Sequence, residues 1–288
     1  MCSALIEDIV FHTVEFSDPA FEQDGLRLAT VRSPALGRRA DISLWVPRAE
    51  SISTLLILLH GVYGGHWVWS HKAGVHRTAQ AMLTAGEIHP LVIAMPSDGL
   101  SRDGSAYLTW PGAEDVERWI VEEVPAIARL AAPALQPDAR IAIAGLSMGG
   151  YGALRLGAKY APRFSAISAH SSITQIREME DFVEDPLAEY LTCGPPAELS
   201  ALHWLEAHRD LLPPLRFDCG TEDDLIAGNR NLHQALRRQN IAHEYAEFPG
   251  AHVWSYWQQH IPDTLSFVDQ ISPQREEPID THVIAPQF

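Results

Sequence analysis

The sequence contains few cysteines, no long apolar run and fewer basic than acidic residues. Its three cysteines, Cys2, Cys193 and Cys219, show no paired spacing, so we expect reduced thiols in a cytoplasmic protein rather than a disulfide framework. No run of about 18 apolar residues occurs, which argues against a membrane-spanning helix. Residues 1–8 carry early acids and no basic start, a pattern not typical of a secretory signal.

The shortage of positive charge limits the partners that the chain can have. The 288 residues include 37 acids against 21 lysines and arginines, which gives a formal net charge of −16. Such a surface repels phosphate backbones and anionic lipids. We therefore expect neither a nucleic-acid nor a membrane partner, and a small molecule as the substrate.

Sequence motifs for cofactors and metals are also missing. There is no Gly-x-Gly-x-x-Gly or Walker loop, no His-Glu-x-x-His and no Cys-x-x-Cys. His66, His71 and His76 recur every five residues, which on a helix rotates successive side chains by about 140°. They would not converge on one ion, and we expect no metal and no cofactor.

The chain does contain a regular alternation of strand and helix patterns. The expected strands are 26–33, 41–46, 54–59, 91–95, 141–144, 164–169, 215–219 and 243–248. The expected helices are 72–85, 113–130, 149–159, 199–211, 229–239 and 253–271. This order predicts an α/β fold with a mainly parallel eight-stranded sheet, the first pair antiparallel, and helices on both faces, as in the α/β-hydrolase plan.

Two segments depart from this alternation. No linker divides residues 1–271, which we interpret as one domain, whereas the tail 272–288 has three prolines and no clear period. Residues 171–200 are irregular and acidic, and they lie between two expected core strands. We interpret them as a small cap over the ligand pocket; the alternative is a peripheral excursion.

The most informative motif is Gly-Leu-Ser-Met-Gly at 145–149, between an expected strand and an expected helix. Gly-x-Ser-x-Gly at such a junction is the nucleophile elbow, a turn so tight that small residues flank the serine. The strained turn exposes the hydroxyl above the sheet, so Ser147 is the candidate nucleophile.

A serine nucleophile needs a base, and the base needs an acid that orients it. In this fold the chain order is serine, then acid, then histidine. The candidate acid is Asp223 on the loop after the 215–219 strand, with Asp224 as the rival. Glu222 is expected to point away, and Asp218 lies inside the strand.

The candidate base is His252, on a loop that follows the last expected strand. His233 and His260 fall within helical patterns, and His243 begins a strand. The oxyanion donors are expected to be the backbone N–H groups of Met148, next to the serine, and of Val62 in the 60–65 loop. The alternative is that Gly61 serves only the turn of that loop.

Aromatic residues on rim loops are candidates for lining the substrate pocket. We select Trp67 after the 60–65 loop, Tyr107 in the 99–111 loop and Trp254 after His252. Such rings can bind an acyl group, an aryl group or a sugar. The alternative for each is ordinary packing.

With these motifs in place, the chain resembles the "putative esterase" family of α/β-hydrolases, which includes esterase D (S-formylglutathione hydrolase), tributyrin esterases, feruloyl esterases and the antigen 85 mycolyltransferases. The similar segments cover roughly 26–268. They are His-Gly-Val-Tyr-Gly-Gly at 60–65, Met-Pro-Ser-Asp-Gly at 95–99, Gly-Leu-Ser-Met-Gly-Gly at 145–150, Cys-Gly-Thr-Glu-Asp at 219–223 and Pro-Gly-Ala-His at 249–252.

The resemblance carries residue roles onto this chain. The family's Gly-x-x-Asp pattern falls on Asp223, and its residue after His-Gly falls on Val62. The family often has an aromatic after the acid, where this chain has Asp224, so the choice between the two aspartates stays open. The resemblance also implies a homodimer as a candidate assembly.

Together these features predict a serine carboxylesterase that hydrolyses short-chain or small aryl or alkyl esters through an acyl-enzyme. Within enzymes, the alternatives are a thioesterase of the S-formylglutathione type and an acetyl or feruloyl esterase acting on carbohydrate esters. The alternative from another class is a catalytically silent binding protein on the hydrolase fold.

Overall fold

The computed structural model describes residues 11 and 13–271, so the expected tail at 272–288 lies outside the described residues. Within that part of the chain, nine strands form one sheet in the order β1-β2-β3-β5-β4-β6-β7-β8-β9. The bounds are β1 (Val14–Phe16), β2 (Leu26–Ser33), β3 (Arg38–Trp45), β4 (Ile52–Leu59), β5 (Val92–Pro96), β6 (Leu135–Leu146), β7 (Ala166–His170), β8 (Leu215–Gly220) and β9 (Glu244–Phe248).

The sheet combines an antiparallel edge with a parallel centre. β1 pairs with β2, β2 with β3 and β3 with β5 in antiparallel fashion, whereas β4 to β9 pair in parallel. The α/β-hydrolase fold class and the eight expected strands are present. The count of eight was wrong because β1 was missed; three residues with exposed or half-buried side chains give no hydrophobic pattern.

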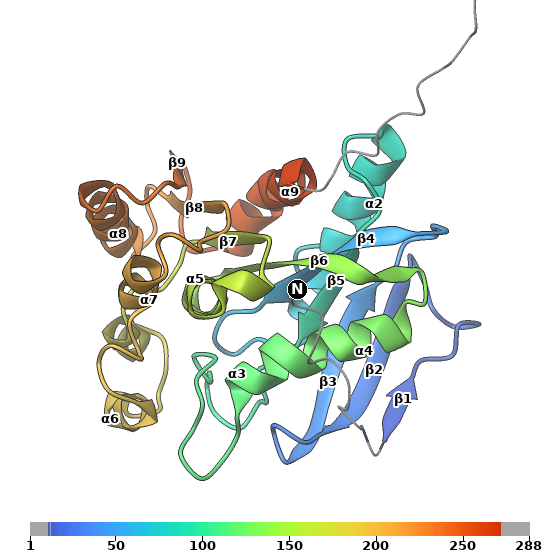
Figure 1. Cartoon of the computed structure of the whole chain (residues 1–288), viewed down its shortest axis with the longest axis horizontal. Coiled ribbons are helices and arrows are strands. Elements are labelled where there is room, and N and C mark those ends of the chain that lie inside the picture. Colours follow the sequence, from blue (N-terminus) through green and yellow to red (C-terminus); the bar gives the residue numbers. More distant parts are fainter. Residues whose placement is uncertain (1–10, 12, 272–288) are drawn as a thin grey trace, which may run out of the picture.

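The helices cover both faces of the sheet (Figure 1). In that view α2 and α9 lie above it, and α3, α4 and α5 lie below. The helical bounds are α1 (Val68–His71), α2 (Val75–Ala85), α3 (Val116–Arg118), α4 (Val124–Ala131), α5 (Met148–Lys159), α6 (Leu187–Tyr190), α7 (Ala201–Ala207), α8 (Ile226–Arg238) and α9 (Trp254–Ile271). No helix that the structure describes is both long and apolar enough to cross a bilayer.

The core consists of two apolar layers, one on each side of the sheet. On β4, the side chains of Leu55, Ile57 and Leu59 pack into the layer between the sheet and helices α4 and α5. Those of Leu56 and Leu58 pack into the layer between the sheet and helices α2 and α9. A central parallel strand is covered on both faces, which explains why β4 has an unbroken apolar run instead of alternation.

Two of the expected helices differ from the patterns that predicted them. The 72–85 pattern begins late because Gly74, with φ +66°, separates α1 from α2. In the 113–130 pattern a π-helical turn joins α3 to α4, with the Val124 N–H donating to the Trp119 carbonyl. Pro125 follows at the start of α4 and lacks an N–H, so the regular hydrogen-bond ladder cannot continue through it.

A buried ionic network anchors α5, the helix that follows the candidate nucleophile. Arg155 is 1% exposed and pairs with Glu117 of α3 and with Glu198. Lys159 pairs with the same two acids. Burial would raise the pKa of Glu117, but the two cations outweigh it and hold the pKa below its ordinary value. The network therefore ties α5 to α3 and to the end of the 171–200 segment.

Replacing Arg155 with methionine should destabilise the fold by about 3 kcal/mol, because a buried carboxylate loses its main partner while Lys159 still compensates in part. Urea unfolding followed by circular dichroism measures this change. Arg77, in an exposed pair with Asp24, is the control, and Arg77→Met should leave the unfolding midpoint unchanged. Equal midpoints for the two variants would contradict a structural role for the network.

Candidate active site

Ser147 lies in a strained turn between β6 and α5. Its φ is +54° and its ψ is −121°, a conformation that few residues other than glycine adopt. The turn is held by its backbone: the Ser147 N–H donates to the His170 carbonyl of β7, and the Ser147 carbonyl accepts from Ile173. A Cβ at Gly145 would overlap the carbonyl of Gly149, which accounts for the small residues on both sides of the serine.

The loops after β8 and β9 are bound to each other along their backbones. The Thr221 N–H donates to Phe248, and the Glu222 N–H donates to Gly250. The Gly250 carbonyl lies so close to Gly220 that a Cβ there would overlap it. This contact places the residues that follow in each loop, Asp223 and His252, side by side.

The three side chains form a continuous chain of hydrogen-bonding distances. His252 Nε2 lies 3.1 Å from Ser147 Oγ. His252 Nδ1 lies 2.9 Å from Asp223 Oδ2 and 3.1 Å from Oδ1. The nucleophile, base and acid candidates are thus brought together although Ser147 and His252 are 105 positions apart in the sequence.

The two candidate acids have different environments. Asp223 is 2% exposed, and its Oδ1 also accepts the Leu225 N–H. Burial alone would raise the pKa of Asp223, but the His252 imidazole and this N–H outweigh it and hold the pKa below its ordinary value. Asp224 is exposed. The geometry therefore favours Asp223 as the partner of His252.

The loop after β4 lies directly against the serine. A Cβ at Gly61 would be 3.6 Å from Ser147 Oγ. A Cβ at Gly104 would meet both the Met148 sulfur and Val62 Cγ1, so these two residues meet on one side of the site. The N–H groups of the first helical turn lack intrahelical partners, and Met148 is the first residue of α5.

Buried polar contacts fix the shape of this loop. His60 Nδ1 lies 2.7 Å from the Gly61 carbonyl, and His60 Nε2 accepts the Asp98 N–H. The Tyr107 hydroxyl donates to the His60 carbonyl. Sequence reasoning assigned no role to His60 or Asp98; the Met-Pro-Ser-Asp-Gly segment at 95–99 was the available indication.

The three pocket aromatics have different positions. Tyr107 is fully buried against α5, so the expectation that it lines an open pocket was wrong, because its hydroxyl supports the His60 loop instead. Trp67 is 43% exposed. The Lys72 ammonium lies 6.0 Å from the Trp67 ring and 5.4 Å from the Trp254 ring, so these two indoles lie at one surface position.

The 171–200 segment, called the cap insertion from here on, reaches the candidate base. The Phe182 ring lies 5.2 Å from the His252 ring, and Trp257 contacts the same imidazole edge-on at 4.9 Å. Sequence reasoning missed both aromatics. Phe182 is the only aromatic between the start of the cap insertion and its first proline, which was a weak indication.

One carboxylate joins the cap insertion to the loop after β4. Asp103 Oδ2 accepts the backbone N–H groups of Glu184 and Asp185. The same oxygen accepts the Tyr63 hydroxyl, and the Tyr63 N–H donates to the Asp103 carbonyl. The cap insertion and this loop are therefore fixed relative to each other.

The arrangement has the parts that acyl transfer requires. A histidine within reach of a serine hydroxyl can accept its proton, and a buried carboxylate can orient the imidazole and stabilise its positive charge. Among residues 11 and 13–271, no group of three His, Cys, Asp or Glu side chains is placed to hold a metal ion. The contacts of Ser147, His252 and Asp223 offer nucleophilic chemistry.

Two known proteins that are named as esterases are similar to this chain. The chain is 27% identical over 240 residues to an acetyl esterase of Caldicellulosiruptor saccharolyticus, which covers 78% of this chain and 86% of that protein. A ferulic acid esterase structure superposes with a TM-score of 0.72 at 25% identity, covering 86% of this chain and 98% of the other.

A third protein has a similar fold. The S-formylglutathione hydrolase FrmB of Staphylococcus aureus superposes with a TM-score of 0.73 at 20% identity, covering 89% of this chain and 99% of that one. The family described as "Putative esterase" matches residues 33–268. This chain therefore belongs to the putative esterase family of α/β-hydrolases.

Proposed function

We propose that the protein is a serine carboxylesterase that uses Ser147 as nucleophile, His252 as general base and acid, and Asp223 as the orienting carboxylate. The observation that carries the proposal is the line of contacts from Ser147 Oγ through the imidazole to Asp223. The substrates are short-chain or small aryl or alkyl esters. The names of two relatives, an acetyl esterase and a ferulic acid esterase, support small acyl groups.

In the first half of the reaction, Ser147 Oγ attacks the ester carbonyl as its proton passes to His252 Nε2. The resulting oxyanion is held by the N–H groups of Val62 and Met148, the proposed oxyanion hole. Collapse of this intermediate breaks the carbon–oxygen bond, and His252 donates the proton to the leaving alcohol. Ser147 is left as an acyl ester.

In the second half, water attacks the acyl ester and gives its proton to the same imidazole. The serine leaves with that proton, and the carboxylic acid is released. Asp223 stays ionised throughout, which fits the direction of its pKa. Trp67 and Trp254 are proposed to flank the entrance for the ester.

A thioesterase of the S-formylglutathione type is the second candidate, because the same groups would expel a thiol as readily. The fold shared with FrmB favours it. Rates on a glutathione thioester and on the matching alkyl ester separate the two candidates. A cytoplasmic location belongs to the proposal and rests on the free thiols of Cys193 and Cys219. Homodimer formation is likewise proposed and is measured by light scattering.

Replacing Ser147 with alanine should lower kcat by about 10⁶-fold, a magnitude taken from subtilisin, because the triad acts as a unit. Initial rates on p-nitrophenyl esters of increasing chain length measure this loss and size the acyl pocket. Ser255→Ala, at an exposed position on α9, is the matched control. Equal rates for wild type and Ser147→Ala would assign the activity to another nucleophile.

If wild type is inactive on all esters, labelling with a fluorophosphonate distinguishes an unsuitable substrate from a silent binding protein. An activated Ser147 reacts covalently, and the Ser147→Ala variant does not. Absence of labelling in the wild type would support the binding protein.

Replacing Asp223 with asparagine should lower kcat by about 10⁴-fold, as for the equivalent change in trypsin, because an amide stabilises the wrong imidazole tautomer. Asp224→Asn, a neighbouring change of the same chemistry at an exposed position, should leave kcat within about twofold. Both variants are compared on one p-nitrophenyl ester. The reverse order of losses would make Asp224 the triad acid.

The pH dependence should show one ascending limb. The base must be a neutral imidazole, because a protonated one cannot accept the serine proton, so kcat/KM should rise with pH and then level off. Asp223 adds no step between about pH 5 and 8, because its pKa is held below the ordinary value of about 3.9. A rate that is flat over this interval would contradict the role of His252.

A further inference from the structure

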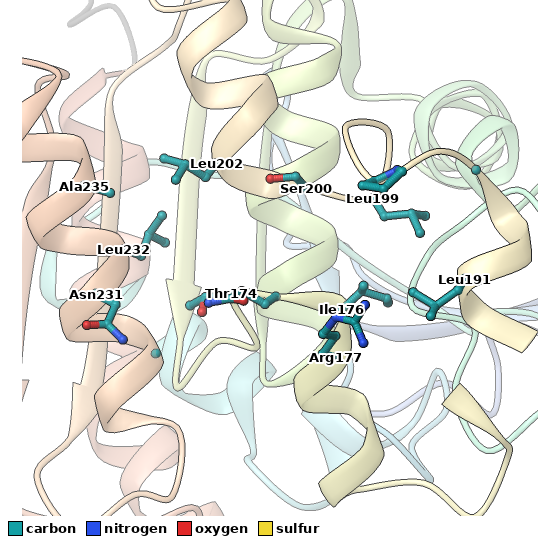
Figure 2. Close-up of a pocket in the computed structure, with 14 residues that line it drawn as sticks. Thr174, Ile176, Arg177, Leu191, Leu199, Ser200, Leu202, Asn231, Leu232 and Ala235 are labelled. Carbon is teal, nitrogen blue, oxygen red and sulfur yellow. The ribbon is translucent and has the colours of Figure 1, made fainter. Parts of the chain in front are cut away.

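A cavity lies apart from the candidate active site, between the cap insertion, α7 and α8 (Figure 2). Its volume is about 560 Å³, which is within the range of about 300–1,000 Å³ typical of small-molecule sites. Ser147, Asp223 and His252 are not among the residues that line it. The cavity is therefore a separate space from the one where the ester would react.

The cavity has a largely apolar wall. Ile176, Leu191 and Leu199 line it from the side of the cap insertion, and Leu232 and Ala235 line it from α8. Figure 2 shows these two groups facing each other across the space, with α7 above. An aliphatic chain or a ring placed between them would be removed from water, which is the main source of affinity for apolar ligands.

The charge on the cavity wall is opposite to that of the protein. Arg177 is the one charged residue among those that line the cavity, and no carboxylate lines it, although the chain has a net charge of −16. Nearby acids are already engaged: Glu178 accepts N–H groups of its own turn, Glu189 pairs with Arg102, and Glu198 belongs to the buried network.

The exposed Arg177 lies on the cap side of the cavity, opposite Asn231 of α8 (Figure 2). No described carboxylate is within ion-pair distance of its guanidinium. An arginine with free donors next to an apolar space is suited to a carboxylate, since it can bind both oxygens at once. The apolar body of such a ligand would extend toward Leu232 and Ala235.

Hydrogen bonds within the protein hold the walls of the cavity in place. The side-chain amide of Asn229 on α8 donates to the Ser172 carbonyl in the cap insertion. The Ile173 N–H donates to the Ser147 carbonyl, one residue before Thr174 reaches the cavity. A preformed site lowers the entropic cost of binding, because the protein does not have to become ordered when the ligand arrives.

We propose that this cavity is a binding site for a monocarboxylate with an aliphatic body, such as a medium-chain fatty acid. The carboxylate is held by Arg177, and the chain lies between the cap insertion and α8. The site is independent of the reaction at Ser147.

The test uses the full chain carrying Ser147→Ala, so that binding is measured whether or not the protein is an esterase. Isothermal titration with decanoate should give one saturable site per chain. Arg177→Gln should weaken decanoate at least about tenfold, the loss expected for one charge-assisted contact, and should leave binding of the neutral decanol unchanged. Ala235→Trp should abolish binding of both ligands by filling the cavity.

Arg238→Gln is the matched control, since it removes the same charge from the exposed end of α8 outside the cavity; it should leave decanoate binding unchanged. The proposal is overturned if decanoate does not bind to the parent protein. It is also overturned if the Arg177→Gln and Ala235→Trp variants bind decanoate as tightly as the parent protein does. The second result would place the acid in another site. Arg177→Gln changes only an exposed side chain. Its result is therefore informative even if the Ala235→Trp variant does not fold.

Discussion

The contact between the backbones of Gly145 and Gly149 is the constraint on which the site depends. Because β6 turns into α5 within a few residues, the two glycines lie in contact and no Cβ fits at position 145. The turn gives Ser147 a positive φ. Met148 is the first residue of α5, so its N–H has no intrahelical partner. Gly149 in turn lies against the carbonyls of Leu59 and His60. One tight turn thus fixes the position of Ser147 relative to the loop that follows β4.

Much of this arrangement could be predicted from the sequence, because the informative residues are governed by local rules. Glycines around Ser147 and an apolar run before it specify an elbow at the end of a central strand. Parallel strands end at one edge of the sheet, so the loops holding Asp223 and His252 had to lie on the same side as the serine. Chain order then eliminated the histidines that precede Ser147. The sequence left the choice between Asp223 and Asp224 open, and in the structure the buried Asp223 contacts His252.

The features that escaped prediction depend on contacts between distant segments. The ring of Phe182 reaches His252 across 70 residues of chain, and the irregular sequence around it gives no period from which its direction could be inferred. Tyr107 lies on a loop, where exposure is the ordinary expectation, yet it is buried beneath the His60 carbonyl. The short β1 strand is defined by its pairing with β2 and not by its own composition. Tertiary packing decided each case.

The carboxylate of Asp103 has a consequence for the entropy of binding. It receives hydrogen bonds from Tyr63 beside the proposed oxyanion hole and from Glu184 and Asp185 in the cap insertion. Conformational freedom of both segments is therefore lost when the chain folds, and not when a ligand arrives. A substrate meets walls that are already ordered. Selection among substrates then depends on how well each fits a fixed shape, because little of the binding free energy goes into ordering the protein.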